Sequence, residues 1–387
     1  MLRGSPRILL APDKFKGTLT AAEVAHGLSV GIRDVLPCAT VRLLPVADGG
    51  DGTLEVAAAT RYRLVEIPAA GPLGEASRTR IAVQGSTAVL ELASVCGLQA
   101  LHGRQRQPER CTTYGLGVAM RGALGLGARR LVVGLGGSAS TDGGAGMLVG
   151  LGARVLDSAG REVPPTPHHL GEAARLDLST LDPTLGEADL TFAVDVDAPL
   201  LGRNGAAQVF GPQKGADPAT VTRLEQAMVQ WARLVQDAAP HADPSAPGAG
   251  AAGGTGFAGL VLGGRLCSGS DLCLDLSGFD EALRDADVVV TGEGRLDTQT
   301  LLGKVPAKVA TRAKAAGLPT IAVVGSRSPQ LSDQVLSAHG FARIYTLVDH
   351  APRAAHDVAV SQQALRTLGV RLAHDLHQFI PSLAESE

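Results

Sequence analysis

The amino-acid sequence predicts an α/β protein with a doubly wound parallel sheet and a second α/β domain inserted into it. Strand-like and helix-like segments alternate through roughly the first 65 and the last 100 of the 387 residues. The middle of the chain instead has short, hairpin-like segments. Alternating strands and helices are typical of parallel sheets covered by helices on both faces. We therefore expect one domain over residues 1–66 and 287–387, and an inserted domain over residues 67–286 that carries a glycine-rich phosphate loop.

The N-terminal segment has the pattern of a strand, a helix and a second strand. A short apolar run at 8–11 predicts a buried strand, and residues 41–44 predict the next one. Between them, Thr20 is placed to cap a helix whose apolar side chains recur every four residues from Val24. A further helix is expected over residues 54–59.

The middle of the chain predicts mixed structure. Residues 81–83 and 88–92 are strand-like runs joined by Gln-Gly-Ser-Thr, a connection short enough for an antiparallel hairpin. Residues 240–256 are dominated by Ala, Gly and Pro, which predicts a long loop or hinge. The other expected elements are a helix over 116–124, an extended stretch at 154–156 and a strand over 190–194.

The C-terminal part returns to alternating strands and helices. The expected elements are strands over 288–290, 320–324 and 344–347, a helix over 306–316 that could begin at Lys304, and a closing helix over 358–376.

The amino-acid composition argues against several classes of function. Hydrophobic residues make up 45% of the chain and charged residues 19%, as in ordinary globular proteins. A net charge of −3 and an aromatic content of 3% argue against nucleic-acid binding. No apolar run approaches the ~20 residues of a membrane span, so we expect a cytoplasmic protein without a membrane partner. The five cysteines are scattered, which indicates reduced thiols rather than disulfides or a zinc site: Cys38, Cys96, Cys111, Cys267 and Cys273.

A glycine-rich segment follows the apolar run at 131–133. Glycines let successive backbone N–H groups converge on an anion, and hydroxyl side chains add donors. The segment therefore predicts a loop that binds nucleotide phosphates. A tight turn that only requires small residues is the alternative. The predicted cofactor-binding residues are Gly136, Gly137, Ser138, Ser140, Thr141 and Asp142.

Charged residues gather in several other loops that follow predicted strands. Ligands of open α/β sheets bind outside the carboxyl ends of the strands, so these loops favour a shared cleft. Carboxylates among glycines suit Mg²⁺, and lysine or arginine suits the charge of a phosphoryl group. The loops hold Asp13 to Lys16, Asp48 and Asp51, Asp195 and Asp197, Glu293 to Asp297, and Gly325 to Arg327.

Each of these charges also has a structural explanation. Asp48 or Asp51 could cap the following helix, Lys14 and Lys16 could be solvated, and Glu293 could pair with Arg295. His168 and His169 lie in a proline-rich stretch with no acid or cysteine nearby, so we expect them to be exposed and inert.

Taken together, the motifs resemble the bacterial type of glycerate kinase. Five segments carry the resemblance, in the order that the family shows: Pro12 to Gly17, Ala47 to Thr53, Gly134 to Gly144, Val209 to Ala216 and Gly292 to Asp297. The chain departs from the family pattern at Lys14, Asp51, Thr141 and Ala198, where Ser, Glu, Asn and Asn are common. None of these departures removes an acid.

The resemblance implies a kinase that uses ATP and Mg²⁺ to phosphorylate D-glycerate, most simply at the 2-hydroxyl, on a Rossmann-like domain with an inserted α/β domain. We expect Lys16, Asp48, Asp195 and Arg295 to act in catalysis, and Asp197, Glu293 and Asp297 to bind metal. The product, 2- or 3-phosphoglycerate, is not settled by the sequence, and neither is the exact division of the acids. A homo-oligomer is also left open.

Two other functions compete with this interpretation. Gly134-x-Gly136-x-x-Ala139, with Asp157 about 20 residues on, matches the fingerprint of an NAD(P)-dependent dehydrogenase. The glycines at 143–146 argue against it, because each costs ~1 kcal/mol within the helix that the fingerprint requires. The other alternative is a nucleotide-binding protein without catalysis.

Overall fold

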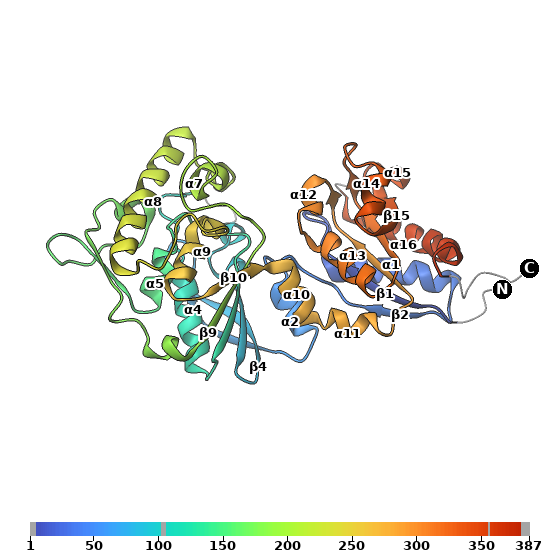
Figure 1. The fold of residues 1–387 in the computed structure, drawn as a ribbon, viewed down its shortest axis with the longest axis horizontal. Coiled ribbons are helices and arrows are strands. Elements are labelled where there is room, and N and C mark those ends of the chain that lie inside the picture. The colour runs from blue at the N-terminus through green and yellow to red at the C-terminus, as the bar shows by residue number, and fades with distance from the viewer. Residues whose placement is uncertain (1–4, 102–105, 355–356, 381–387) are drawn as a thin grey trace, which may run out of the picture. The chain divides into compact units, whose positions relative to one another are not determined.

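The computed structural model describes residues 5–101, 106–354 and 357–380, and it confirms an α/β protein with two main sheets. The chain forms two compact units (Figure 1). The first comprises Met1–Asp48 with Ser270–Glu387, and the second comprises Gly49–Gly269. The boundaries expected from the sequence, after residues 66 and 286, fall later in the chain than these limits, and that division into domains stays a prediction.

The first unit contains a five-stranded, fully parallel sheet. Its strands lie in the order β15 (Phe341–Thr346), β13 (Thr320–Val324), β11 (Val288–Gly292), β1 (Arg7–Pro12) and β2 (Thr40–Leu43). The chain runs outward from β1 to β2 on one side and from β11 to β15 on the other. The strand order therefore reverses between β1 and β11, and such a switch point is where open α/β sheets bind ligands.

Helices cover both faces of this sheet, and alternate side chains of β13 reach each face. Ile321 and Val323 join the apolar cluster of α1 and α16, whereas Ala322 and Val324 join that of α13 and α14. Strands buried on both faces are expected to be apolar throughout, as β13 is. The helices are α1 (Ala21–Val35), α10 (Gly269–Ser277), α11 (Phe279–Leu283), α12 (Thr298–Leu301), α13 (Val305–Ala315), α14 (Asp333–Ala338), α15 (Leu347–His350) and α16 (Val358–Asp375).

Local sequence explains where α1 begins. Thr20 accepts a hydrogen bond from the backbone N–H of Glu23, and the Glu23 carboxylate accepts one from the N–H of Thr20. This reciprocal capping box satisfies two N–H groups that a helix start leaves unpaired. The helix then buries Val24, Leu28 and Ile32, so the predicted cap and apolar spacing are confirmed.

The second unit contains a six-stranded mixed sheet. Its order is β10 (Arg265–Ser268), β9 (Asp189–Val194), β6 (Arg130–Gly134), β5 (Thr87–Glu91), β4 (Ala76–Gln84) and β3 (Arg63–Ala70). Strands β10 to β5 are parallel, and β5, β4 and β3 pair antiparallel. The predicted antiparallel hairpin is therefore confirmed.

Most helices of the second unit contribute buried side chains to one apolar core, which includes Phe192, Trp231 and Phe257. The helices are α2 (Thr53–Ala58), α3 (Ala93–Cys96), α4 (Tyr114–Gly125), α5 (Ala145–Gly150), α6 (Pro167–Leu170), α7 (Ala206–Phe210), α8 (Pro218–Ala238) and α9 (Ala251–Val261).

Short elements complete the two units. The 3-10 turns η1 to η4 lie at Leu98–Leu101, Pro183–Glu187, Pro212–Lys214 and Leu376–Gln378. Two small ribbons pair β7 (Arg154–Leu156) with β8 (Arg175–Asp177) and β12 (Arg295–Leu296) with β14 (Ser326–Arg327).

The predicted loop at 240–256 is wrong at its C-terminal end, because helical hydrogen bonding of α9 starts at Ala251. The backbone φ angles of Ala252, Gly253 and Gly254 are positive, so the first turn is not regular helix. Gly253 approaches the backbone of Ser140 so closely that a Cβ there would lie 2.1 Å from the Ser140 carbonyl oxygen. Small residues are therefore required here by packing, not by flexibility. Across the described ranges, no helix is both long and apolar enough to cross a membrane.

Helices α1 and α16 lie side by side in Figure 1, and glycines let them approach closely. A Cβ added to Gly31 would lie 2.0 Å from the carbonyl oxygen of Arg366, and one added to Gly369 would lie 2.4 Å from that of Leu28. Real Cβ atoms do not come so near to backbone oxygens, so the two helices could not keep this spacing with larger residues.

We predict that Gly31→Ala lowers the free energy of unfolding by about 1–3 kcal/mol or more, because the added methyl group must push α16 away. Thermal and urea unfolding of the purified protein would measure this. Gly125→Ala is the matched control: it is a helical glycine with no atom near the added Cβ, and it should be neutral or stabilising by up to about 1 kcal/mol. Equal stability of the two variants would show that the close helix contact carries no constraint.

Candidate active site

In the first unit, acidic side chains follow three neighbouring strands of the parallel sheet. Asp13 follows β1, Asp48 follows β2 and Glu293 follows β11. Burial and the charge of Asp48 raise the pKa of Asp13 to about 8. Burial likewise raises the pKa of Glu293 to about 7, although its Oε1 accepts a hydrogen bond of 2.6 Å from the Thr300 hydroxyl. The switch point of this sheet is therefore a region where carboxylates are held close together and partly desolvated.

Two predicted cations lie in the same loops. Gly294 packs against the loop after β1, since a Cβ on Gly294 would lie 3.3 Å from the backbone nitrogen of Lys16. Lys16 and Arg295 are both exposed. Neither side chain makes a hydrogen bond or ion pair in the described parts of the chain, so the structural ion pair considered for Glu293 and Arg295 is not formed. Both cations remain available to an anionic ligand.

Asp297 and Asp48 have structural partners. Asp297 caps α12, where its Oδ1 accepts hydrogen bonds from the N–H groups of Gln299 and Thr300 at 3.0 and 3.3 Å. The Asp48 carboxylate lies 3.7 Å from Nζ of Lys14. Among the residues that the structure describes, no group of three or more His, Cys, Asp or Glu is arranged to hold a metal ion by itself.

In the second unit, the glycine-rich loop follows β6 and lies against residues 49–50. A Cβ on Gly134 would lie 2.4 Å from the carbonyl oxygen of Gly49, and one on Gly136 would lie 2.3 Å from Cα of Gly50. These two glycines are therefore required for packing. Gly137 differs, because its φ of +70° is a backbone conformation that favours glycine and its surface is exposed. The loop thus combines tight packing with an accessible tip.

Asp142 is buried beneath this loop and organises it. Its Oδ2 accepts hydrogen bonds from the N–H and hydroxyl of Thr113 at 2.7 and 2.8 Å and from the N–H of Gly146 at 3.2 Å. Its Oδ1 accepts one from the N–H of Gly144 at 3.2 Å. Burial raises the pKa of Asp142, and these donors oppose the rise. The carboxylate is therefore used inside the fold, where it ties the loop to the start of α4.

The hydroxyls of the loop are not all satisfied. The side-chain oxygens of Ser140 and Thr141 are buried and have no hydrogen-bond partner. Buried polar atoms are nearly always paired in native proteins, so each exception requires an explanation. A loop with exposed backbone at Gly137 and two unpaired hydroxyls fits a phosphate-bearing ligand, which offers many acceptor oxygens.

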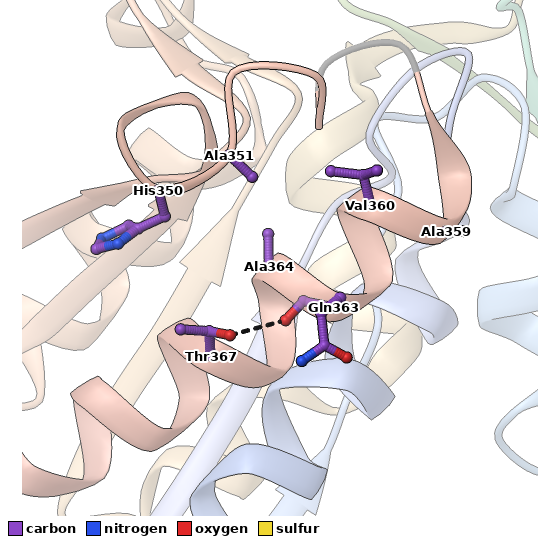
Figure 2. A pocket seen from close by; sticks show the side chains of 7 residues that line it. All are labelled: His350, Ala351, Ala359, Val360, Gln363, Ala364 and Thr367. Atoms are coloured by element: carbon purple, nitrogen blue, oxygen red, sulfur yellow. Dashed lines mark hydrogen bonds between the residues drawn. The ribbon is translucent and has the colours of Figure 1, made fainter.

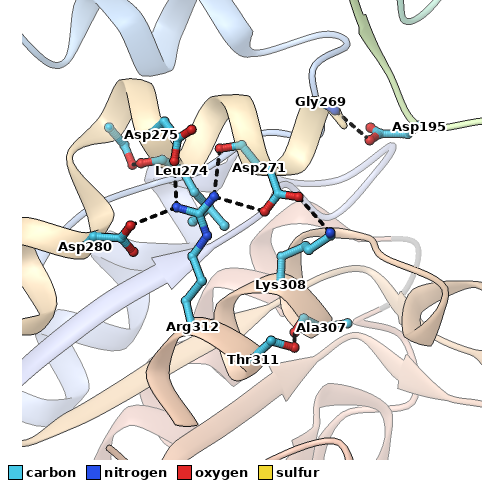
Figure 3. A network of polar contacts seen from close by, with 11 residues as sticks. Asp195, Gly269, Asp271, Leu274, Asp275, Asp280, Ala307, Lys308, Thr311 and Arg312 are labelled. Carbon is cyan, nitrogen blue, oxygen red and sulfur yellow. Dashed lines mark hydrogen bonds and ion pairs between the residues drawn. The ribbon is translucent and has the colours of Figure 1, made fainter. Parts of the chain in front are cut away.

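Asp195 and Asp197 follow β9 in the second unit. Both are exposed, while Val196 between them is half-buried, which is the alternation expected of extended chain. Oδ1 of Asp195 accepts a hydrogen bond of 3.1 Å from the N–H of Gly269, the first residue of α10 (Figure 3). The predicted pair of acids on one side of the chain is thus consistent with the burial pattern, and Asp195 also holds a helix start.

A network of ion pairs binds α10 and α11 to α13 in the first unit (Figure 3). Arg312 reaches Asp271, Asp275 and Asp280 at 2.9, 2.6 and 3.2 Å, and Nζ of Lys308 lies 2.7 Å from Asp271. Partial burial lowers the pKa of Arg312, but the three carboxylates outweigh it and the net pKa is raised. This network fixes α10 on the helical layer beside the sheet.

Two pockets on the surface of the first unit are lined by none of the predicted site residues. One of about 440 Å³ is lined by residues of the α15 end and α16, including His350, Val360 and Gln363 (Figure 2). Another of about 600 Å³ lies at the amino ends of β11 and β13, beside Lys314 and Phe379. The second pocket therefore lies at the opposite end of the sheet from the carboxyl ends of the strands, where sheets of this kind bind ligands.

Comparison with known proteins shows the family to which this chain belongs. The model of the glycerate kinase family matches residues 8–377. Glycerate kinase of Bacillus subtilis strain 168 is 40% identical over 380 residues, covering 94% of this chain and 99% of that protein. Glycerate 2-kinase of Escherichia coli K12 is 38% identical over 362 residues, covering 91% and 94%. The chain belongs to the glycerate kinase family.

A solved structure agrees with this assignment. The crystal structure of a protein described as glycerate kinase 2 from Salmonella typhimurium LT2 superposes with a TM-score of 0.82 at 36% identity, covering 97% of this chain and 99% of that one. The resemblance seen in the sequence motifs is thus confirmed, together with the enzyme class: a phosphotransferase with glycerate kinase activity.

The dehydrogenase alternative is wrong. Its fingerprint requires a helix that starts within the glycine-rich segment, but in this glycerate kinase fold α5 begins only at Ala145, after two glycines with positive φ. Asp157, the expected ribose ligand, instead accepts hydrogen bonds from the N–H groups of Ala159 and Arg161 in an exposed turn. A strand followed by glycines therefore does not identify a dinucleotide site without the helix.

The sequence analysis gave no role to three charged residues in or near the loops of this glycerate kinase. Asp13 was named only as part of a charged loop and of a motif. Oε1 of Glu91, at the end of β5, accepts hydrogen bonds from the N–H groups of Gly52 and Thr53 at 2.6 and 3.2 Å and so caps the start of α2. Lys214 is buried and donates to Ser138 and Ser140. The partners of Glu91 and Lys214 are distant in sequence, although those partners all stand in motifs that carried the family resemblance.

We predict that Asp142→Asn destabilises the protein by about 2–4 kcal/mol, because an amide cannot accept from all the donors around Oδ1 and Oδ2 and leaves buried N–H groups unpaired. Thermal unfolding without any ligand measures this loss. Asp177→Asn is the control, since that aspartate accepts hydrogen bonds only in an exposed turn. An unchanged melting temperature for Asp142→Asn would mean that the carboxylate does not organise the loop.

Proposed function

We propose that this glycerate kinase transfers the γ-phosphoryl group of ATP to the 2-hydroxyl of D-glycerate in a reaction that requires Mg²⁺. The similarity to a protein described as glycerate 2-kinase supports the 2-hydroxyl. The observation that carries ATP as the donor is the glycine-rich loop, in which the hydroxyls of Ser140 and Thr141 are buried without partners. Such a loop gains hydrogen bonds when phosphate oxygens reach it.

The residues of the second unit divide into two roles in this proposal. Gly136, Gly137, Ser138, Ser140 and Thr141 bind nucleotide phosphates, and Asp142 supports them from below. Asp195 orients the attacking hydroxyl, and Asp197 contributes to the metal. Phosphoryl transfer depends mainly on alignment and on neutralising charge, so a strongly basic group at the hydroxyl is not required.

The residues of the first unit supply charge. Lys16 and Arg295, which have no partners of their own in the described ranges, bind the glycerate carboxylate or the transferred phosphoryl group. Asp48 orients the substrate, while Glu293 and Asp297 bind metal. Because Oε1 of Glu293 is engaged by Thr300, its Oε2 is the atom left for a ligand.

The donor set fits Mg²⁺. This ion prefers oxygen ligands and usually takes only one or two carboxylates, with water and phosphate oxygens completing its shell. A cage of three acids is therefore not needed. When bound, Mg²⁺ would neutralise charge on the phosphate oxygens and hold them for in-line attack.

The finer description of the fold also belongs to this proposal. The strand order of the first unit, with its reversal between β1 and β11 and helices on both faces, supports a Rossmann-like doubly wound domain that carries an inserted α/β domain. Oligomeric state and cytoplasmic location stay predictions from the sequence.

We predict that the purified protein converts ATP and D-glycerate to ADP and 2-phosphoglycerate, and that EDTA stops the reaction until excess Mg²⁺ is added. Phosphorus NMR of the product distinguishes the 2- from the 3-phosphate directly. A 3-phosphoglycerate signal would overturn the position of transfer, whereas full turnover in EDTA would overturn the metal requirement.

We predict that Asp195→Asn lowers kcat by ~100-fold or more with little change in melting temperature, since the amide oxygen can still accept the hydrogen bond from Gly269 but the charge is lost. Asp195→Ala, which removes both, should also lower the melting temperature. If Asp195→Asn keeps near-normal turnover, or fails only because it unfolds, Asp195 has a structural role alone.

A further inference from the structure

Lys214 is a buried cation directly beneath the glycine-rich loop. It ends the short turn η3 and is only 2% exposed, although lysine is rarely buried. Its Nζ donates a hydrogen bond of 2.8 Å to Oγ of Ser138 and another to the carbonyl oxygen of Ser140. These partners lie more than 70 residues away in the sequence, so Lys214 joins η3 to the predicted phosphate loop.

Within the described ranges Lys214 forms no ion pair. Its hydrogen bonds to Ser138 and Ser140 account for two of the three N–H groups of the ammonium. Asp142 is near enough to favour the charged form of Lys214, but the Asp142 carboxylate is occupied by Thr113, Gly144 and Gly146. A buried charge without a counter-ion is unfavourable, and an anion bound at the loop would compensate it.

The other charged and titratable groups around Lys214 do not supply that negative charge. Burial raises the pKa of the Cys111 thiol to about 11, so it is neutral at physiological pH. Burial also raises the pKa of the nearby Cys96 thiol, to about 12. Arg106 packs on Gly215 and is itself a cation, with its Nη1 donating to the carbonyl oxygen of Gln213.

The loop above Lys214 is at the same time incompletely hydrogen-bonded, as the unpaired hydroxyls of Ser140 and Thr141 show. Ser140 belongs to both observations, since its carbonyl oxygen accepts from Lys214 while its hydroxyl has no partner. An excess of positive charge and a shortage of acceptors thus coincide in one loop. Phosphate supplies both a negative charge and acceptor oxygens.

We propose that Lys214 is a positioning residue for the nucleotide: it holds the loop at 136–141 in its anion-binding conformation and supplies the positive charge that attracts the phosphates. This inference rests on the proposed function, because it takes the loop as the nucleotide site. Lys214 acts through Ser138 and Ser140 and through its field. It therefore affects nucleotide affinity and not the recognition of glycerate.

The pH dependence of binding follows from the burial of Lys214. Burial lowers its pKa to about 8 in the free protein, against the smaller opposing effect of Asp142. A bound anion favours the charged form and raises this pKa again. Nucleotide affinity should therefore be full below pH 8 and should fall above it, by at most about tenfold per pH unit, until the pKa of the bound state is reached.

The test is calorimetric titration of the full-length protein with MgADP, which avoids turnover. Lys214→Met should weaken MgADP binding by about 10- to 100-fold and leave the KM for D-glycerate within about twofold. Lys214→Arg, which keeps a charge in a different geometry, should bind more tightly than Lys214→Met. Lys314→Met removes an exposed lysine in the first unit and should change neither constant.

Calorimetry reports the folded fraction and its affinity separately, so a folding defect cannot imitate the expected result. If the folded fraction of Lys214→Met binds MgADP as tightly as the unmodified protein, the proposal is overturned. It is also overturned if the unmodified protein binds MgADP equally tightly from pH 7 to 9.5, a measurement that needs no variant. Failure of the unmodified protein to bind MgADP at any pH would instead contradict the proposed use of ATP.

Discussion

The cost of burying charge is the constraint on which the candidate site depends. Asp13, Glu293 and Asp142 lie in loops that follow strands, and Lys214 lies at the end of the turn η3. Burial shifts the pKa of each of these groups in the direction that favours its neutral form. Asp142 is compensated inside the protein by five hydrogen bonds from backbone and hydroxyl donors. The other three are compensated less completely, and they are the groups for which a cation or a phosphate would be a favourable partner.

Elements with strong local signals could be predicted from the sequence. Helix α1 combines a capping box with apolar residues every fourth position, and both features are used in the structure. Helix α8 has comparable signals, with Asp217 as its cap, Pro218 in its first turn and Trp231 on its buried side, yet the sequence analysis did not identify it. Strand β3 was missed for a different reason: Arg63 and Leu64 pair with β4, so the strand is defined by its partner rather than by its own pattern.

In the candidate site, too, features set by neighbouring residues could be predicted, and features set by contacts between distant residues could not. The loops were found because each follows an apolar strand, and strand ends are visible in the sequence. The state of each side chain was not visible. Whether Glu293 pairs with Arg295 or with Thr300, or whether Lys214 is solvated or beneath the loop, depends on contacts made by folding. Lys214 contacts residues more than 70 positions away in the sequence. The periodic pattern of apolar residues within one helix or strand does not predict a contact between residues so far apart.

Glycines in a loop can be required for close packing or for binding a ligand, and the sequence alone does not distinguish these two reasons. Gly134 and Gly136 are needed because residues 49–50 pack against them, which any tight turn could require. Gly137 has a positive φ and an exposed surface, and the neighbouring hydroxyls of Ser140 and Thr141 lack partners. Packing explains the first two glycines fully but leaves the hydroxyls unexplained. The functional reading of this loop therefore depends on its polar atoms and on the cation beneath them, rather than on its number of glycines.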